Sequence, residues 1–474
     1  MMMEMDDRTQ AIHAGLQAIV GSDQIFTGVA TDRWSRDWTG QFEGMPLAVV
    51  RPGTCEEIAA ILRLAGQYHV PVVPIAGNTG LNGGAYGAGS ILVSIERMNR
   101  IREIRSDARV AVVEAGVIVA ALDSAVAQYG LTFPLTFGAA GSAMIGGVLS
   151  TNAGGANVLR YGNVRDLCLG LEVVLPDGLV LDLMTALKKD NSGFDLRDLI
   201  IGAEGQLGII TAAVLKLHPR PVFHATALVA LEDLREAPAL LNAFQDASGN
   251  AVTAYEFMSR SYVAGYEKLV PTARRFFETS YPAVLLVELA TVRNEELGEL
   301  LETVLGDAME RGAVADAVIA QSDMQRQEMW ALREAAAELA FQRHPVIDTD
   351  IAVPLDRIAE YLDRIPARMA AIDPGFTDIA VAHFGDGNIH YTVWPSKHDP
   401  AVEAALRAAI DALAIEMDGT FSAEHGIGLC KLPSMAKHKS SVALDIMRTL
   451  KAAFDPNAIL NPGKTLPGKG FSLF

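Results

Sequence analysis

Three glycine-rich segments constrain this chain most strongly, because glycine permits backbone conformations and close approaches that other residues do not. The first segment, residues 77–84, places four glycines in eight positions directly after an apolar run at 70–74. The second covers 138–155 and the third covers 202–210. Consecutive amides in such loops can converge on a phosphate or pyrophosphate. A single segment of this kind is more often an ordinary surface loop, so the information lies in the three together.

The usual nucleotide-binding fingerprints are missing from the sequence. No G-x-G-x-x-G opens a helix, which disfavours a Rossmann domain. Gly463-Lys464-Thr465 resembles the end of a P-loop, but Ala458 stands where that motif needs glycine. No G-x-S-x-G elbow is present to indicate an α/β-hydrolase.

The chain has 474 residues, more than one hydrophobic core usually supports, so we expect two domains. Between about 45 and 220, short apolar runs alternate with helix-like segments, which predicts a mixed α/β domain. It begins with a strand at 47–50 and a helix at 56–68 that Thr54 can cap. The two prolines within 218–221 block both helix and central strand, so we place the domain boundary there.

Beyond this boundary, longer amphipathic helices lie between strands, and we expect an α+β domain. The predicted helices are 231–244, 294–311, 323–342 and 400–417, and the predicted strands include 283–290 and 379–384. A last helix at 441–454 ends at Asp455-Pro456-Asn457, and the tail after it is too short to form a domain.

Charge and cysteine usage limit the partners and the compartment. A net charge of −18 repels a phosphate backbone, so we expect no nucleic-acid partner. The first residues are acidic, without the basic start of a signal peptide, and no stretch of about 18 uncharged apolar residues occurs. Cys55, Cys168 and Cys430 form no C-x-x-C pair and indicate no disulfide framework. We expect a cytoplasmic protein without a transmembrane segment.

The order of the glycine-rich segments resembles that of a known flavoprotein family. Residues 74–84, 146–155 and 202–211 follow the pattern of the vanillyl-alcohol-oxidase/p-cresol-methylhydroxylase flavoproteins. Within that family the chain is similar to the D-lactate, D-2-hydroxyglutarate and glycolate dehydrogenases, from about residue 46 to residue 464. The resemblance implies an FAD-binding domain of the p-cresol-methylhydroxylase type at 1–220, an α+β cap domain for the substrate at 221–440, and a helix and tail at 441–474 that return to the FAD domain.

The resemblance also implies how FAD is bound. The first loop would cradle the pyrophosphate with backbone amides, and residues of the other segments and the tail would contact the flavin or the adenosine. The implied cofactor-binding residues are Pro74, Gly77, Asn78, Thr79, Gly80, Leu81, Ser142, Gly146, Asn152, Gly205, Gly208, Ile210 and Asn461. Relatives that attach FAD covalently often carry histidine in the first loop, and 74–84 contains none. We therefore predict non-covalent FAD.

A hairpin at 378–394 carries two histidines. If Asp386-Gly387 forms a two-residue type I′ turn, His383 lies directly opposite His390. Such cross-strand partners hold their Cβ atoms about 4.5–5.5 Å apart, so two imidazoles can bind one cation. Asn388 falls on the same face, and Phe384 and Ile389 point to the other face. The alternative is a pair of strand histidines without a ligand, which is commoner for an isolated pair.

The segment Glu424-His425-Gly426 favours the metal interpretation, because it adds a carboxylate and an imidazole in a glycine-flanked loop. His/His/Glu is a credible set for Zn²⁺ or Mn²⁺ with open positions. In the 2-hydroxy-acid dehydrogenases that the chain resembles, the residues matching His383, His390 and Glu424 bind the metal, and the residue matching His425 is the base. Arg333 matches the family's substrate arginine and suits a carboxylate, with a solvated helix face as the alternative. We count Asn388 with Arg333 and His425 as catalytic candidates.

The expected substrate is a small D-2-hydroxy acid with one carboxylate, such as D-lactate. The 2-hydroxyglutarate branch tends to carry threonine and lysine where this chain has Ala337 and Asp348, and an acidic group there would repel a second carboxylate. D-2-hydroxyglutarate remains the alternative substrate. Flavin chemistry without alcohol oxidation and a non-catalytic FAD-holding subunit are the competing functions. The sequence leaves the electron acceptor open among an electron-transfer flavoprotein, a quinone, a cytochrome and oxygen, and a homodimer is compatible with the sequence.

Overall fold

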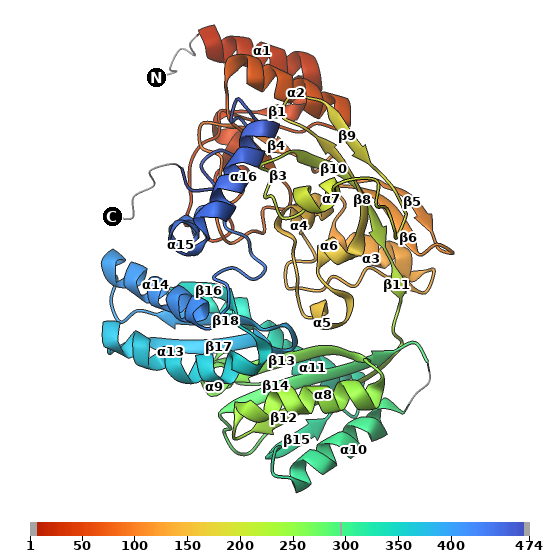
Figure 1. Ribbon diagram of the computed structural model, residues 1–474, viewed down its shortest axis with the longest axis vertical. Helices are drawn as coiled ribbons and strands as arrows, with labels where there is room; N and C mark the ends of the chain where they lie inside the picture. The colour runs from red at the N-terminus through yellow and green to blue at the C-terminus, as the bar shows by residue number, and fades with distance from the viewer. Residues whose placement is uncertain (1–6, 294–295, 469–474) are drawn as a thin grey trace. The chain divides into compact units, whose positions relative to one another are not determined.

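The computed structural model describes residues 7–293 and 296–468, which divide into two compact units (Figure 1). Unit 1 comprises the described residues up to Gly154, the segment Asn163–Pro219, and the described residues from Glu424 onward. Unit 2 comprises Gly155–Gly162 and Arg220–Ala423. Unit 1 therefore resumes at Glu424, ahead of the residue 441 expected from the sequence, because the loop after Glu424 is hydrogen-bonded to other residues of unit 1.

Unit 1 contains a small, mostly parallel sheet and a larger antiparallel one. The first has the order β1-β2-β4-β3, in which β2, β4 and β3 are parallel, and the second has the order β5-β6-β10-β8-β9. A short pair, β11-β7, completes the strands. Their bounds are β1 Ile25–Phe26, β2 Ala48–Val50, β3 Val72–Ile75, β4 Ile91–Ser94, β5 Ile101–Arg105, β6 Val110–Glu114, β7 Leu131–Thr132, β8 Cys168–Val174, β9 Val180–Leu183, β10 Ile209–Lys216 and β11 His218–Pro219.

Helix α2 (Cys55–Tyr68) connects β2 to β3, as the sequence predicts. Thr54 caps it by accepting a hydrogen bond from the Glu57 amide at 3.2 Å. Its inner face buries Ile58, Ile61 and Leu62 completely. The other α-helices of unit 1 are α1 Asp7–Val20, α3 Val119–Ala127, α4 Ile145–Thr151, α6 Val164–Leu167, α7 Leu196–Ile200, α15 Leu432–His438 and α16 Ser441–Phe454.

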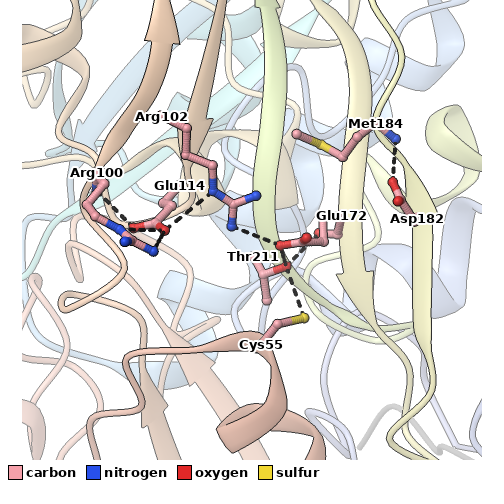
Figure 2. A network of polar contacts seen from close by, with 8 residues as sticks. All are labelled: Cys55, Arg100, Arg102, Glu114, Glu172, Asp182, Met184 and Thr211. Atoms are coloured by element: carbon pink, nitrogen blue, oxygen red, sulfur yellow. Dashed lines mark hydrogen bonds and ion pairs between the residues drawn. The ribbon is translucent and has the colours of Figure 1, made fainter.

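A polar network crosses the antiparallel sheet of unit 1 (Figure 2). Glu114 accepts hydrogen bonds from the guanidinium groups of Arg100 and Arg102, and Arg102 also donates to Glu172. Thr211 donates to the same Glu172 carboxylate at 2.9 Å. Burial alone would raise the pKa of Glu114, but its hydrogen bonds with Arg100 lower that pKa below its usual range. The network thus joins β5, β6 and β8 by charged side chains and β10 by the hydroxyl of Thr211.

Unit 2 is built on a seven-stranded antiparallel sheet with the order β15-β12-β14-β13-β17-β18-β16. The strands are β12 Phe223–Leu231, β13 Val252–Ser259, β14 Ala283–Thr291, β15 Asp316–Ile319, β16 Ile347–Ala352, β17 Thr377–His383 and β18 Asn388–Trp394. The helices are α5 Val158–Tyr161, α8 Ala237–Ser248, α9 Arg260–Leu269, α10 Leu297–Glu310, α11 Asp323–Glu334, α12 Ala336–Ala340, α13 Ile358–Ile372 and α14 Pro400–Glu416. Of the helix predicted at 294–311, residues 294–295 lie outside the described part of the chain.

The two faces of this sheet differ in chemistry. One face packs against α8, α10, α13 and α14 in a large apolar core that includes Phe244, Tyr361 and Phe384. On the other face α9 and α11 cover a smaller cluster that includes Met258, Tyr262 and Met329. The candidate site residues of unit 2 lie on this second face, beside the smaller cluster.

The helix predicted at 323–342 is in fact interrupted, because α11 ends at Glu334 and α12 begins at Ala336. The Tyr262 hydroxyl donates to the carbonyl oxygens of Leu332 and Arg333 at 2.7 and 3.0 Å. Those carbonyls would otherwise accept helical hydrogen bonds from the following turn. The buried tyrosine therefore ends the helix just after Arg333. The expected helix at 231–244 also starts later, because Leu231 is the last residue of β12.

Candidate functional site

The hairpin that carries the two histidines has a register different from the predicted one. His383 is the Cα partner of Asn388, and Val381 is the partner of His390. The turn contains a 3₁₀ segment, Phe384–Asp386, followed by Gly387 with φ of 88°. The predicted two-residue type I′ turn is therefore wrong, since the turn uses two more residues.

The two histidines nevertheless share one face of the sheet. Side chains alternate along a strand, so a register shift of two residues leaves each side chain on its original face. The ring centroids of His383 and His390 lie 5.4 Å apart, with an angle of 84° between the rings. Phe384 and Ile389 point to the opposite face, where both are fully buried. The hairpin thus presents two imidazoles together, away from the apolar core.

Glu256 of β13 lies beside His383 and was not anticipated from the sequence. It is the Cα partner of His383 across the β13–β17 ladder and is only 1% exposed. His383 Nδ1 lies 3.0 Å from Oε1 and 2.8 Å from Oε2 of this carboxylate. The only signal in the sequence was a single acidic residue inside the apolar strand Val252–Ser259.

Arg333, near the end of α11, is held by the same carboxylate. Its Nη2 atom lies 2.8 Å from Glu256 Oε2, and its side chain is 8% exposed. The solvated helix face considered as an alternative is therefore wrong. The contact is a close ion pair, and no described residue accepts a hydrogen bond from Arg333 Nε or Nη2. A buried guanidinium with unused N–H groups is suited to bind an anion.

Asn388 and Asp350 extend this polar face toward β16. Asn388 Nδ2 donates to Asp350 Oδ1 at 3.0 Å and to the Ile351 carbonyl at 2.9 Å, whereas the buried Asn388 Oδ1 has no partner in the described chain. Asp350 is in turn the Cα partner of His390. An amide oxygen without a partner, beside two imidazoles, is a free acceptor for a hydroxyl or a cation.

The two positions expected to disfavour a second carboxylate on the substrate lie at different places in unit 2. Asp348 is in β16, half-buried on the same face as Asp350, and accepts a hydrogen bond from Thr392 at 2.7 Å. Ala337 is exposed in α12, four positions after Arg333. Asp348 therefore belongs to the polar face itself, two positions along its strand from the partner of His390.

Glu424 and His425 are the first residues of the last segment of unit 1. His425 Nε2 lies 3.5 Å from Glu424 Oε1. The loop after them is fixed on two sides. Glu204 accepts hydrogen bonds from the Ile427 and Gly428 amides at 2.9 and 2.8 Å. Asn82 Nδ2 donates to the carbonyls of His425 and Gly426 at 3.1 and 2.8 Å.

This loop therefore depends on two of the glycine-rich segments, since Asn82 lies in the first and Glu204 in the third. A Cβ atom on Gly428 would lie 2.1 Å from the Asn82 carbonyl oxygen, so only glycine fits there. Burial raises the pKa of Glu204, although both amide hydrogen bonds oppose that effect.

The three glycine-rich segments, which belong to unit 1 except for Gly155, lie against one another. A Cβ on Gly77 would lie 2.3 Å from the Ser142 carbonyl, which brings the first segment against the second. A Cβ on Gly205 would lie 2.7 Å from Pro74 in β3, just before the first segment, and a Cβ on Gly84 would lie 4.0 Å from Glu204 Oε2, which brings the third segment against the first. By contrast, a Cβ on Gly80 would meet no atom within 4 Å, and the same holds for Gly138 and Gly141. The backbone at these three glycines is open to a ligand.

The remaining predicted cofactor residues lie within or beside these segments. Asn78 and Asn152 adopt positive φ, and Asn152 ends α4. The others are placed as follows: Thr79 and Leu81 in the first loop, Gly146 in α4, Gly208 just before β10, and Ile210 in β10.

The tail after α16 closes the first and third segments together. Asn461 Nδ2 donates to the carbonyls of Glu204 and Gly84 at 2.7 and 3.3 Å. Lys464 Nζ donates to the Gly84 carbonyl at 3.1 Å and to the Tyr86 carbonyl. Burial lowers the pKa of Lys464 to about 7. Asn461 is therefore in contact with the first and third segments.

No helix in the described residues is long and apolar enough to cross a bilayer.

Two family profiles match the sequence. The profile of the FAD binding domain matches residues 46–184, and that of the FAD linked oxidases, C-terminal domain, matches residues 220–465. The chain is 36% identical to D-2-hydroxyglutarate dehydrogenase of Xanthomonas citri pv. viticola, over 91% of this chain and 92% of the relative. It is 34% identical to the mitochondrial D-2-hydroxyglutarate dehydrogenase of Bos taurus, over 91% and 79%. It is 32% identical to a putative mitochondrial D-lactate dehydrogenase of Schizosaccharomyces pombe, over 94% and 86%.

Two solved structures share the fold. The 4-ethylphenol oxidase from Gulosibacter chungangensis superposes with a TM-score of 0.74 at 19% identity, covering 98% of each chain. A p-cresol methylhydroxylase superposes with a TM-score of 0.74 at 16% identity, covering 97% of each chain. The two-domain fold of the p-cresol-methylhydroxylase type, expected from the sequence, is confirmed.

Proposed function

Because the chain belongs to the FAD-linked oxidases, we propose that it is an FAD- and metal-dependent dehydrogenase that oxidises a D-2-hydroxy acid to the 2-oxo acid. The observation that carries the proposal is the pair of imidazoles, His383 and His390, 5.4 Å apart on one face of the sheet. Beside them lies a buried arginine whose Nε and Nη2 make no hydrogen bond within the described chain.

The residues present fit FAD. Gly80, Gly138 and Gly141 leave their backbone open, as close approach of a pyrophosphate or a flavin ring requires. FAD, when bound, accepts the hydride that leaves C2 of the substrate, at its N5 atom. We assign the cofactor contacts to the glycine-rich segments and Asn461 as expected from the sequence. We also propose that the attachment is non-covalent, because residues 74–84 contain no histidine.

The donor set also fits a divalent cation, and we assign its ligands as His383, His390 and Glu424. Ala423, the residue before Glu424, donates from its amide to the carbonyl of Asp350, the strand partner of His390. That short connection supports Glu424 as the third ligand. Two imidazoles and one carboxylate suit Zn²⁺ or Mn²⁺. The cation, when bound, lowers the pKa of the substrate hydroxyl.

Three side chains of the protein would bind the substrate carboxylate, accept the hydroxyl proton and orient the hydroxyl. Arg333, whose Nε and Nη2 have no acceptor among the described residues, would bind the substrate carboxylate and so fix which end of the acid enters. The neutral imidazole of His425 accepts the hydroxyl proton near pH 7. Asn388 Oδ1, which no described residue uses, accepts a hydrogen bond from the hydroxyl or orients it.

We propose a monocarboxylate such as D-lactate as the preferred substrate. Asp348 lies on the same face as His390 and would repel a second carboxylate. D-2-Hydroxyglutarate is the second candidate, because relatives carrying that name are 36% and 34% identical over most of this chain. The two electrons taken from the substrate would finally reach an electron-transfer flavoprotein, a quinone, a cytochrome or oxygen.

An anaerobic flavin-reduction screen tests the proposal. The purified protein is mixed with D- and L-lactate, D- and L-2-hydroxyglutarate, D-malate and NADPH, before and after chelation. D-Lactate should bleach the flavin faster than the dicarboxylates, and chelation should abolish bleaching until Zn²⁺ or Mn²⁺ is restored. Faster bleaching by D-2-hydroxyglutarate would transfer the assignment to that substrate. Bleaching by NADPH alone, or by none of them, would refute the proposed reaction.

A further inference from the structure

We propose that Glu256 is a positioning residue that serves two site residues at once, fixing the His383 ring for metal binding and holding Arg333 for the substrate carboxylate. The inference rests on the proposed function, since it assigns a role to a group behind that site. Glu256 itself belongs to none of the sequence motifs described above.

The buried position of Glu256 is energetically unfavourable for a carboxylate, because burial removes its solvation. It is 1% exposed on a central strand, and Ala254 and Met258, its neighbours on the same face, are fully buried. A buried carboxylate without charged partners would lose its solvation without compensation. Its ion-pair partners in the described chain are His383 and Arg333, and both are site residues. The burial is therefore compensated by residues that the reaction uses.

The contact with His383 determines which ring nitrogen carries the proton. An ionised carboxylate only accepts hydrogen bonds, so Nδ1, at 2.8 and 3.0 Å from its oxygens, must be the protonated nitrogen. In the neutral imidazole the lone pair is then on Nε2. Metal-binding histidines commonly donate their second N–H to a carboxylate in this way, which fixes the tautomer and orients the ring. Glu256 thereby prepares His383 as a ligand through Nε2.

The contact with Arg333 balances the charge of its guanidinium group. The Nη2–Oε2 distance of 2.8 Å gives strong attraction, yet Arg333 Nε and Nη2 have no hydrogen-bond acceptor in the described chain. A guanidinium satisfied on all sides could not bind a substrate, and an unpaired buried one would be unstable. With Glu256 beside it, the Arg333 guanidinium has a charged partner that holds it in place. It still has N–H groups that can bind the substrate carboxylate.

Metal affinity, measured without substrate, tests the first role. The FAD-loaded protein competes for Zn²⁺ and for Mn²⁺ with a chromophoric chelator. Glu256→Gln keeps the volume but removes the charge, and it should raise the metal dissociation constant by about 10- to 100-fold, as loss of an outer-shell partner generally does. Flavin content should remain at the wild-type value.

Glu288→Gln is the matched control. Glu288 is also a buried carboxylate on this face, in the neighbouring strand β14, but it pairs with Arg326 and Trp330 and with neither His383 nor Arg333. This variant should bind metal within about threefold of wild type even if it is less stable. Equal metal affinity in Glu256→Gln and wild type would overturn the first role. Absence of metal binding by the wild type itself would instead refute the proposed function.

The second role is read from steady-state kinetics with D-lactate at saturating metal. Glu256→Gln should raise KM by about 10-fold or more, while Glu288→Gln should leave KM unchanged. An unchanged KM in Glu256→Gln would overturn the role toward Arg333.

A measurement on the wild type covers the case in which Glu256→Gln does not fold. Long-range ¹H–¹⁵N correlation spectra of metal-free protein with labelled histidine report the protonated ring nitrogen, and His383→Gln identifies the His383 signal. A proton on Nδ1 agrees with the proposal, and a proton on Nε2 contradicts it.

Discussion

His383 and His390 bring their rings within 5.4 Å of each other although they are not cross-strand partners. The pair lies diagonally across the hairpin, and Asn388 occupies the position opposite His383. The Asn388 amide therefore lies opposite one of the two proposed metal ligands, His383, and its Nδ2 donates a hydrogen bond to Asp350.

Replacing His383 with alanine should remove the metal and most of the activity. Because polarisation by a cation is worth several kcal/mol, we expect kcat/KM to fall by at least about 100-fold. Flavin absorbance should be retained, since the glycine-rich segments belong to unit 1. His398→Ala is the control, because that histidine is exposed in unit 2 and pairs with Glu403. Undiminished turnover in His383→Ala would argue for a non-catalytic flavin-holding subunit or for a metal-free reaction.

Asp348→Lys should change the substrate preference. Replacing a negative charge with a positive one on the face of His390 favours a substrate with a second carboxylate. We expect the ratio of kcat/KM for D-2-hydroxyglutarate over D-lactate to rise by about 10-fold or more. Asp348→Asn removes the negative charge without adding a positive one. It therefore shows how much of the change comes from lost repulsion of the second carboxylate and how much from attraction to lysine. An unchanged ratio in both variants would show that this carboxylate does not contact the substrate tail.

Glu288 should make stability depend on pH over a defined window. Burial would raise its pKa, but the nearby His224 ring and the hydrogen bonds from Arg326 and Trp330 prevail and lower the pKa to about 2. A carboxyl whose pKa is lower in the folded state stabilises the protein above its unfolded pKa of about 4.3, and this contribution is lost as the pH falls toward 2.

We therefore expect Glu288→Gln to lower the free energy of unfolding at pH 7 by about 3 kcal/mol. The difference from wild type should shrink between pH 4.5 and pH 3. Urea unfolding at pH 7, 5, 4 and 3 measures it. A difference that is the same at every pH would show that ionisation of Glu288 contributes nothing.

Glu204→Gln should loosen the loop that follows His425. The Ile427 and Gly428 amides donate to different oxygens of Glu204, and glutamine replaces one of these oxygens with an NH₂ group that cannot accept. We expect faster hydrogen exchange at 426–430 and a kcat reduced about 10-fold, as loss of a charged hydrogen bond of about 1.5–3 kcal/mol implies. Glu114→Gln, in the antiparallel sheet of unit 1, should leave exchange in this loop unchanged. Equal exchange in both variants would contradict the role of Glu204.

The sequence predicted those parts of the site whose residues lie close together along the chain. The glycine-rich segments and the histidine hairpin each lie within a short stretch, and the glycine order identified the family, which the relatives confirm. The turn at Phe384–Asp386 was missed because turn length depends on backbone geometry rather than on composition. The face shared by the histidines was nevertheless right, since strand alternation is insensitive to a shift of two.

Glu256 could not be predicted by such patterns. Its partner His383 lies 127 residues away in the sequence. The contact exists only because β13 pairs with β17, and local sequence patterns do not predict which strands pair over such a distance. The end of α11 was missed for a similar reason, since the tyrosine hydroxyl that ends it comes from α9. Helix periodicity also did not decide whether Arg333 is buried or exposed. The structure shows it buried, beside Glu256.

Lys464 and Gly84, joined by a hydrogen bond, are separated by 380 residues in the chain. During synthesis the first glycine-rich segment therefore leaves the ribosome long before the lysine that will hold it. Unit 2, which ends at Ala423, is complete before this closing contact can form. The flavin-binding part is begun first and finished last, so a nascent chain carries it unfinished while the whole of unit 2 is synthesised.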